Sequence, residues 1–409
     1  MELNRYKLGE CLELQRGYDL TSSQMQGGEV AVVGSNGIIG YHNSERGNSP
    51  CITVGRSGSV GKVHYYEQPT WAHNTALFVK DFKGNNPKYL YYLLKNLHLD
   101  NTFEKGSSVI PSLDRNLVHS LVVPFHKDIN DQRKVVAVLS AIDRKIELNH
   151  QINDNLEAMA KQLYDYWFVQ FDFPNEEGKP YKSNGGVMVW NEDLHMSIPC
   201  TWNTCLLSDY IGSNNTGDWG FDEPAKKRSI KVGCIRGADI VKLNDLPIRY
   251  IKDNNTSKLL SAWDIVIEVS GGSPTQATGR SAFVTPGVLK RNGGNLTCSN
   301  FCHAFTMKDY KASAYFYFMW RMFYDNNNMF NFEGKTSGIK NFMTDTFLAN
   351  RWLDVPTALL DLFFERVKVI YEQIDNNIEE INALTKQRDE LLPLLMNGQA
   401  TVNYHLSYD

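Results

Sequence analysis

The sequence contains an internal repeat, in which two segments share one pattern at an offset of 232 residues. Each segment opens on a Leu-x-Val-Pro motif, at residues 121–124 and 353–356. An Ile-Asp pair follows 18 residues after each proline, at residues 142–143 and 374–375. A pattern that recurs at a fixed offset indicates a duplicated structural unit. We therefore expect the fold to contain two copies of one arrangement.

Behind each opening, apolar side chains recur with heptad spacing, which predicts two long helices at residues 131–170 and 358–398. A globular stretch separates the helices, so the chain must return across it, and we expect an antiparallel coiled coil. A core helix in a larger bundle is the alternative. The expected coiled-coil core consists of Val135, Leu139, Ile142, Ile146, Leu156 and Leu163 in the first helix and Val367, Tyr371, Ile374, Ile378, Ile381 and Leu395 in the second.

Three polar side chains, Asn149, Asn153 and Arg388, occupy core positions of the same heptad pattern. A polar residue at such a position costs stability but can specify the register of the two helices. We expect these residues either to fix the register of the helix pair or to face a third partner.

The stretches ahead of the helices predict two mixed α/β domains. Strand patterns around Gly-rich turns occur at residues 31–41 and 52–66 of the first stretch and 264–284 of the second. Helices dense in aromatic residues follow at 89–94 and 315–320, and we expect their rings in the cores. The fold class is therefore α/β, with the boundaries 1–130 (first domain), 131–170 (first helix), 171–199 (connector), 200–357 (second domain), 358–398 (second helix) and 399–409 (tail).

The formal net charge of -4 gives the chain as a whole no basic excess with which to bind nucleic acid. The charge is uneven, however, because residues 1–130 and 200–357 carry +1 and +4, whereas residues 131–199 and 358–409 carry -4 and -5. The excess of acidic residues thus lies in the two segments that contain the helices. Contact with phosphates requires local basic patches rather than a basic chain. The two globular domains therefore remain compatible with DNA binding.

Motifs for catalysis on DNA are incomplete. Residues 86–89 (Asn-Pro-Lys-Tyr) lack the second proline of the methyltransferase loop that holds a flipped adenine. Residues 55–63 lack a glycine and the final Ser or Thr of a P-loop. Glu-x-Lys triplets at 177–179 and 333–335 lack the preceding acidic residue of a nuclease site. We expect no catalytic residues in this chain.

The seven cysteines form an odd, scattered set, which is typical of reduced thiols. One cluster, Cys298, Cys302 and His303, resembles part of a metal site. A zinc site needs a second Cys/His group at suitable spacing, so we expect buried or incidental thiols and no bound metal. With no signal peptide and no apolar run of about 18 residues, we expect a cytoplasmic protein.

The stretch that follows the first helix carries the most specific pattern. It reads Leu-Tyr-Asp-Tyr-Trp-Phe-Val-Gln-Phe-Asp-Phe-Pro-Asn at residues 163–175, Gly-Lys-Pro-Tyr-Lys-Ser-Asn-Gly-Gly at 178–186 and Ile-Pro-Cys-Thr-Trp at 198–202. It closely resembles the central conserved region of the specificity subunits of type I restriction-modification systems, in which a long helix leads to the second target-recognition domain. The Val-Pro openings of the repeat also resemble this family.

The resemblance implies a non-catalytic DNA-binding subunit with two target-recognition domains, each of which reads one half of a bipartite, asymmetric site. The implied partners are double-stranded DNA, two methyltransferase (M) subunits and restriction (R) subunits. The resemblance places S-adenosylmethionine, ATP and Mg in those subunits and no cofactor in this chain. The chain would direct adenine methylation or restriction. The alternative is a coiled-coil adaptor whose globular domains bind a partner other than DNA.

The helices are long enough to act as a ruler between two half-sites. About 38 residues of helix from Asp131 to Phe168 span roughly 57 Å at about 1.5 Å per residue. One turn of duplex DNA measures about 34 Å. We therefore expect the helix pair to set the distance between the half-sites.

Basic residues in Gly/Ser-rich loops are the expected DNA contacts, because arginine and lysine bind phosphates and guanine edges. Each of these residues has an alternative as a solvated surface charge. The expected DNA-binding residues are Arg56, Lys62, Lys105 and Arg115 in the first domain and Arg236, Arg280, Lys335 and Lys340 in the second.

Overall fold

The structure is a computed structural model that describes residues 2–25, 27–100, 112–271, 273, 275–336 and 339–402, with the side chains of residues 335, 336 and 339 excepted. The chain forms two compact units. Unit 1 consists of Met1–Glu147 and Ile381–Asp409, and unit 2 of Leu148–Glu380. Each unit combines one globule with part of both long helices. The two predicted helix segments are therefore each divided between the units.

The two long helices begin close to their predicted starts. Helix α5 spans Ile129–Tyr164 and follows strand β9 (Val122–Phe125). Helix α9 spans Thr357–Met396 and follows strand β23 (Arg351–Asp354). Helix α5 is continued directly by a π-helical turn at Asp165–Val169.

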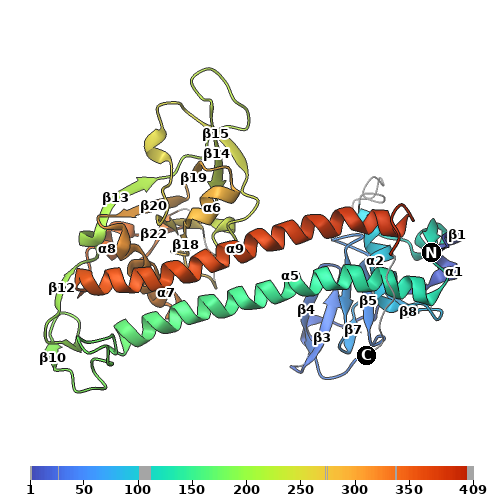
Figure 1. Ribbon diagram of the computed structural model, residues 1–409, viewed down its shortest axis with the longest axis horizontal. Helices are drawn as coiled ribbons and strands as arrows, with labels where there is room; N and C mark the ends of the chain where they lie inside the picture. Colours follow the sequence, from blue (N-terminus) through green and yellow to red (C-terminus); the bar gives the residue numbers. More distant parts are fainter. Residues whose placement is uncertain are drawn as a thin grey trace. The chain divides into compact units, whose positions relative to one another are not determined.

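Helices α5 (green) and α9 (red) pack in antiparallel fashion (Figure 1). Within unit 2, Asn149 Nδ2 donates to Glu380 Oε2 over 2.7 Å, and Asn377 Nδ2 donates to Asn153 Oδ1 over 2.7 Å. As the residue number rises along α5, the number of its partner in α9 falls. The two helices therefore run antiparallel, as predicted. In unit 1, the Arg388 guanidinium donates to Asp143 Oδ1 over 3.1 Å. The polar core positions therefore bind across the helix pair.

The expected coiled-coil core faces inward in both units. No member of the set is exposed, although the middle of α5 is covered less than its ends. Buried members are Val135, Leu139, Val367, Tyr371, Ile374, Ile381 and Leu395. Half-buried members are Ile142, Ile146, Leu156, Leu163 and Ile378.

Three small sheets are formed by the described residues of the first globule. The four-stranded sheet has the order β2-β8-β5-β6, and the others have the orders β4-β3-β7 and β1-β9. Short helices α1 (Leu8–Cys11) and α4 (Arg115–Ser120) flank them, and α2 (Pro87–Asn96) contributes its buried aromatic face to the core. The strands are β1 (Asn4–Lys7), β2 (Glu13–Arg16), β3 (Val30–Gly34), β4 (Gly37–His42), β5 (Cys51–Gly55), β6 (Val63–Tyr66), β7 (Thr70–Ala72) and β8 (Ala76–Asp81).

The second globule has the corresponding sheets. Their orders are β13-β20-β16-β18, β15-β14-β19 and β12-β23. The strands are β12 (Asn203–Leu206), β13 (Ile211–Thr216), β14 (Ile230–Ile235), β15 (Ile248–Ile251), β16 (Ile265–Glu268), β18 (Ser281–Phe283), β19 (Leu296–Cys298) and β20 (Cys302–Met307). The helices are α6 (Pro286–Arg291), α7 (Ser313–Asp325) and α8 (Thr344–Leu348). A further sheet, β17-β22-β21, is formed by β17 (Ser270–Gly271), β21 (Glu333–Thr336) and β22 (Ile339–Phe342).

The two globules share one topology, because their strand orders correspond strand for strand. Strand β3 pairs in parallel with β7, and β14 pairs in parallel with β19, while the neighbouring pairs are antiparallel in both. The prediction of two mixed α/β domains and two long helices is thus confirmed. The aromatic helices also lie in the cores as expected, with Tyr89, Tyr92, Tyr315 and Trp320 buried.

The connector between α5 and the second globule has its own aromatic core. Phe173 stacks between Tyr181 and Trp202, with ring centroids 4.8 Å and 5.0 Å apart. A hairpin of β10 (Met188–Asn191) and β11 (Met196–Pro199) completes it. Across the described part of the chain, none of the helices has the length and apolar character that a membrane span requires.

Candidate nucleic-acid interface

Four loops of the first globule lie against one another at one end of its sheets. The Thr75 carbonyl accepts a hydrogen bond from Arg56 N over 2.9 Å, and the Thr75 hydroxyl lies 3.3 Å from Ser35 N. The His73 ring lies 3.0 Å from the Leu20 carbonyl. We call these loops the first loop rim, which comprises residues 17–21, 34–37, 55–62 and 73–75.

Four loops of the second globule meet in the same way. Trp219 N donates to Asn300 Oδ1 over 3.0 Å, and Val269 N donates to the Phe301 carbonyl over 2.8 Å. The latter bond corresponds to that between Arg56 and Thr75, so Phe301 takes the place of Thr75. We call these loops the second loop rim, which comprises the described residues 217–221, 236–239, 268–271, 273, 275–280 and 299–301.

One glycine in each globule holds this arrangement together. A Cβ atom at Gly17 would lie 2.2 Å from the His73 carbonyl oxygen, and one at Gly217 would lie 2.1 Å from the Ser299 carbonyl oxygen. In the first globule, Gly17 allows the loop after β2 to cross the loop after β7. In the second, Gly217 allows the loop after β13 to cross the loop after β19. The same backbone frame is present twice, and it carries different side chains in the two rims.

Two of the predicted contacts of the first globule lie on its rim. Arg56 is half-buried, and its guanidinium donates to the Asn74 carbonyl over 3.4 Å. Lys62 is exposed, and its ammonium donates to Asn36 Oδ1 over 2.7 Å. Arg115 is exposed at the start of α4, outside the rim. Lys105 lies outside the described residues.

The predicted contacts of the second globule are paired with carboxylates. Arg280 donates through Nε and Nη2 to Glu268, over 2.8 Å and 2.7 Å, and its side chain is only 18% exposed. Lys340 on β22 lies 2.9 Å from Glu333. Although burial alone would raise the pKa of Glu333, hydrogen bonds from Lys340 and Thr278 lower it below its ordinary value. The side chain of the remaining candidate, residue 335, lies outside the described part of the chain.

Arg236 lies on the second rim and is paired with Asp239. The loop that holds it packs on the Glu268 carboxylate, because a Cβ at Gly237 would lie 2.5 Å from Glu268 Oε1. The rim therefore brings the loop that carries Arg236 against the buried carboxylate that binds Arg280.

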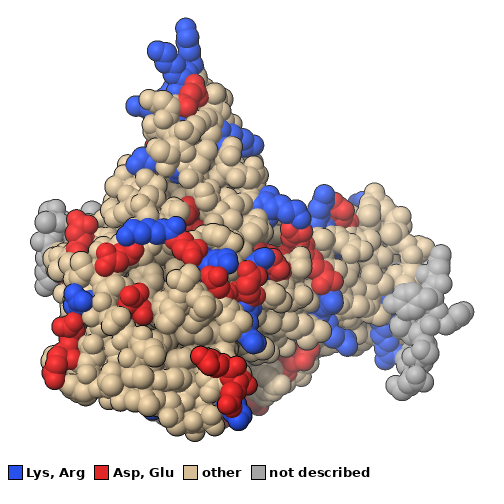
Figure 2. All heavy atoms as spheres, turned by 60° about the vertical axis from the view of Figure 1, so that its left-hand side comes forward, with Lys and Arg blue, Asp and Glu red and all other residues tan. Residues whose placement is uncertain are grey.

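A basic hairpin beside the second rim was missed by the sequence reasoning. Ala225 and Arg228 form a β-bridge, which places Lys226 and Lys227 at the turn between them. Both lysines are exposed, and within the described residues neither has an acidic partner. Figure 2 shows blue side chains gathered at the tip of this globule, where Figure 1 places the loop that leads into β14. The signal available was three consecutive basic residues at 226–228.

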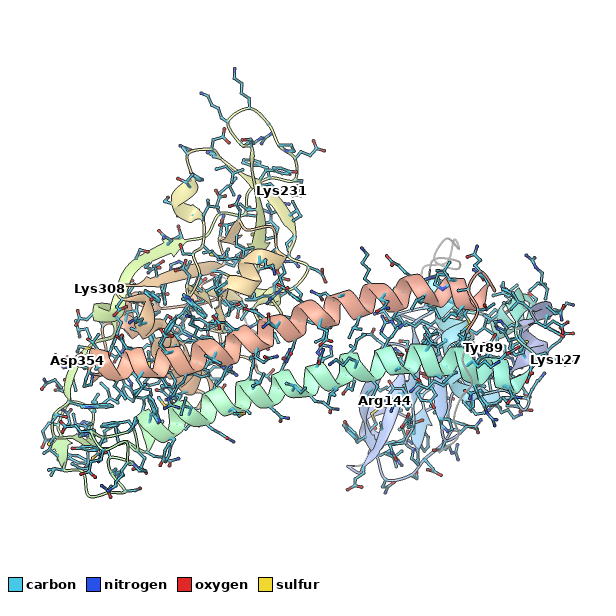
Figure 3. The ribbon with its side chains drawn as sticks, viewed as in Figure 1. Tyr89, Lys127, Arg144, Lys231, Lys308 and Asp354 are labelled. Carbon is cyan, nitrogen blue, oxygen red and sulfur yellow. The ribbon has the colours of Figure 1, made fainter. Side chains whose placement is uncertain are left out.

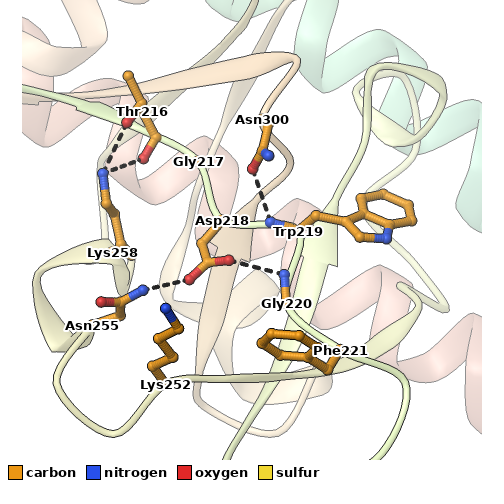
Figure 4. A pocket seen from close by; sticks show the side chains of 10 residues that line it. All are labelled: Thr216, Gly217, Asp218, Trp219, Gly220, Phe221, Lys252, Asn255, Lys258 and Asn300. Carbon is orange, nitrogen blue, oxygen red and sulfur yellow. Dashed lines mark hydrogen bonds between the residues drawn. The ribbon is translucent and has the colours of Figure 1, made fainter. Parts of the chain in front are cut away.

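A surface cavity of about 560 Å³ lies beside this hairpin (Figure 4). Asp218 forms its floor by accepting hydrogen bonds from Asn255 and from the backbone of residue 220. Trp219 and Phe221 stand at its edge with 38% and 39% of their surface exposed. Arg228 stacks on the Phe221 ring at 4.3 Å. Exposed aromatic rings beside cations can hold the bases and phosphates of nucleic acids.

The side chains of the cysteine cluster are not gathered as a set of metal ligands in the described part of the chain. Cys298 and Cys302 are buried, and burial raises the pKa of the Cys302 thiol to about 11. Among the described residues, no group of three His, Cys, Asp or Glu side chains could hold a metal ion.

Comparisons with known proteins agree with this architecture. The family profile described as "Type I restriction modification DNA specificity domain" matches residues 2–158. The chain is 27% identical over 329 residues to the type I restriction enzyme MjaIX specificity subunit of Methanocaldococcus jannaschii. The aligned region covers 77% of this chain and 69% of that protein. It is also 36% identical over 90 residues to the type I restriction enzyme HindI specificity subunit of Haemophilus influenzae. That aligned region covers 21% of this chain and 19% of that protein.

A solved structure has the same fold. The type I restriction-modification S subunit from M. genitalium superposes with a TM-score of 0.55, at 15% identity, over 97% of this chain and 96% of that chain. Because the identity is low, the likeness concerns the fold alone. It extends over both globules and both long helices.

Proposed function

The chain belongs to the specificity subunits of type I restriction-modification systems, and on this premise we propose that it reads a bipartite, asymmetric DNA site, one half-site per globule. The observation that carries the proposal is the duplicated topology, in which one frame of loops occurs twice with different side chains. The first loop rim and the second loop rim would each contact one half-site.

Corresponding positions on the two rims support an asymmetric site. Gly55 N donates to the Lys62 carbonyl over 2.8 Å, and Glu268 N donates to the Arg280 carbonyl over 2.8 Å. Lys62 and Arg280 therefore stand at one position of the shared frame. At that position one rim presents an exposed ammonium and the other a guanidinium held by a carboxylate. Since base contacts determine sequence preference, two such different rims would read different sequences.

As a specificity subunit, the chain is a non-catalytic component of its complex. Methyl transfer from S-adenosylmethionine would belong to two M subunits, and ATP- and Mg-dependent cleavage to R subunits, in the cytoplasm. One face of α5 offers a surface for such partners, because apolar side chains with 36–54% exposure recur there at spacings of four and seven residues. These side chains are Leu148, Ile152 and Met159.

Mapping of methylated adenines tests the proposal. The full chain would be expressed with its M subunits in a host that lacks adenine methylation, and the methylated motif determined across the genome. We expect one motif with two specified halves and an unspecified spacer. Replacing residues 207–352 with the equivalent domain of a relative should change one half only. A motif that changes in both halves, or methylation without a bipartite motif, would contradict the proposal.

A further inference from the structure

We propose that Arg236 reads a guanine in the half-site of the second globule and that Asp239 positions it for this role, an inference that rests on the proposed function. The two side chains pair edge to edge. Arg236 Nε donates to Asp239 Oδ2 over 2.7 Å, and Arg236 Nη2 donates to Asp239 Oδ1 over 2.9 Å.

This pairing leaves the end of the guanidinium free for DNA. A guanidinium has five N–H groups, of which two bind Asp239. The two on Nη1 and the second on Nη2 have no hydrogen-bond partner in the described part of the chain. One N–H from each of Nη1 and Nη2 lies on the end-on edge of the fork, and this pair matches the O6 and N7 acceptors of guanine. The carboxylate therefore fixes one edge of Arg236 and presents the other.

Pre-organisation distinguishes Arg236 from an ordinary surface arginine. A free arginine loses much rotamer entropy when it binds, and a partner that holds it beforehand reduces this loss. Asp239 also accepts the backbone N–H of Arg236 over 3.0 Å, so it fixes both the start and the end of that side chain. Partial burial would raise the pKa of Asp239, but the bonds from Arg236 lower it, so the carboxylate stays ionised at neutral pH.

Accessibility selects Arg236 over Arg280, the other arginine of the second rim with this edge-to-edge geometry. The Arg236 side chain is 44% exposed, whereas that of Arg280 is 18% exposed against the nearly buried Glu268. Arg236 directly follows Ile235, whose carbonyl accepts from Ser299 N over 2.8 Å. It therefore stands beside the tight turn that presents Phe301 to solvent, with 54% of its surface exposed.

The test measures the DNA affinity of the purified complex of the full chain with its M subunits. Duplexes carry the mapped site with 7-deazaguanine, which lacks the N7 acceptor, at each guanine of the second half in turn. We expect one substitution to weaken wild-type binding about 10- to 100-fold. The Arg236→Ala complex should bind the unmodified site about 10- to 100-fold more weakly than the wild-type complex does. Its affinity should not fall further when 7-deazaguanine replaces that guanine. Asp239→Asn should show an intermediate sensitivity.

The controls separate the possible failures. Arg351→Ala removes another exposed arginine with a carboxylate partner, Asp193, away from the rim, and should leave the sensitivity unchanged. If Arg236→Ala keeps the wild-type sensitivity at every guanine, or weakens target and random DNA equally with a smaller salt dependence, Arg236 does not read guanine. A second half-site without a G·C pair also overturns the inference. If the wild-type complex binds target and random DNA alike, the proposed function itself fails.

Discussion

Asp375 on α9 accepts a hydrogen bond from Arg291 of α6 over 2.7 Å, with both side chains only about a tenth exposed. The backbone of Gly287 donates to the same carboxylate over 3.1 Å. Asp143, its counterpart 232 residues earlier, accepts from Tyr92 Oη over 2.6 Å. The repeated Ile-Asp pair thus gives each helix a carboxylate that binds the globule of its own unit.

Loss of the Arg291 charge should destabilise unit 2. Arg291→Met would leave the buried Asp375 carboxylate without its cation, at a cost of about 3–5 kcal/mol in the free energy of unfolding. Arg351→Met, which breaks an exposed pair with Asp193, should cost less than about 1 kcal/mol. Denaturant unfolding of each variant measures the difference. Equal losses would show that the Arg291–Asp375 pair does not hold α6 on α9.

Removal of both charges should restore stability. In the double variant Arg291→Met/Asp375→Leu no buried charge remains unpaired, so unfolding should return to within about 1–2 kcal/mol of the wild type. If the double variant is as unstable as Arg291→Met alone, the loss in the free energy of unfolding comes from packing and not from an unpaired carboxylate.

The basic hairpin should contribute phosphate contacts. We expect Lys226→Ala/Lys227→Ala to weaken binding of target and random DNA by a similar factor and to reduce the slope of log affinity against log salt by about 1.8. Lys308→Ala provides the control, because this exposed lysine follows the end of β20 that is remote from the rim. Figure 3 labels Lys308 at a place well separated from Lys231 of β14. Titrations of DNA from about 50 to 200 mM salt measure the slope. A loss confined to the target would instead indicate base contacts.

The helices could be predicted from the sequence because their signal is local and periodic. Heptad spacing identified core positions such as Val135 and Val367, and the offset repeat indicated the duplication. The polar positions were recognised as well, but their partners were not, because Asn149 meets a residue 231 positions away. The turn that ends α5 at Tyr164 has no periodic signature and was not predicted.

The loop rims could not be predicted, because they arise from contacts between distant loops. Gly17 and Gly217 hold the same place in the frame, yet they are 200 residues apart rather than 232, so the ungapped repeat does not align them. The Gly-rich surroundings of Arg280 predict an exposed loop residue. Its bond to Glu268 joins the two ends of a hairpin twelve residues apart, so the local sequence does not reveal it. Counting charge by segment concealed the run at 226–228, since neighbouring acidic residues offset it.

Acid should loosen the first globule through His126. This buried residue lies 3.1 Å from Tyr89 Oη through its Nδ1 atom, and burial lowers its pKa below the ordinary 6.5. The unfolded chain therefore takes up a proton near pH 6.5 that the folded chain resists, and stability falls as the pH decreases from that value. Hydrogen exchange of the α2 amides should report a smaller free energy of opening at pH 5.5 than at pH 7.5.

A variant isolates the contribution of this histidine. His126→Asn keeps an acceptor for Tyr89 but cannot take up a proton, so the opening free energy of α2 should change less with pH. His150→Asn, on the exposed side of α5, should preserve the wild-type dependence. An unchanged pH dependence in His126→Asn would assign the effect to other groups.

The helix pair should act as a ruler that sets the distance between the two half-sites. Each long helix contributes residues to both units, and the divisions fall after Glu147 in α5 and after Glu380 in α9. Inserting seven residues at both points keeps the apolar seam in register, because one heptad returns each side chain to the same face. It lengthens the helices by roughly 10 Å, or about three base pairs at about 3.4 Å each.

The methylated motif of this paired insertion should keep both halves and gain about three base pairs of spacer. The added DNA also turns one half-site by roughly 36° per base pair relative to the other, so affinity for the lengthened site should be lower than that of the wild type for its own site. Inserting seven residues in α5 alone breaks the pairs that Asn149 and Asn153 make with α9, and should abolish methylation. A paired insertion that still methylates the original spacing at the wild-type rate would refute the ruler, because the distance between half-sites would then not depend on the length of the helices.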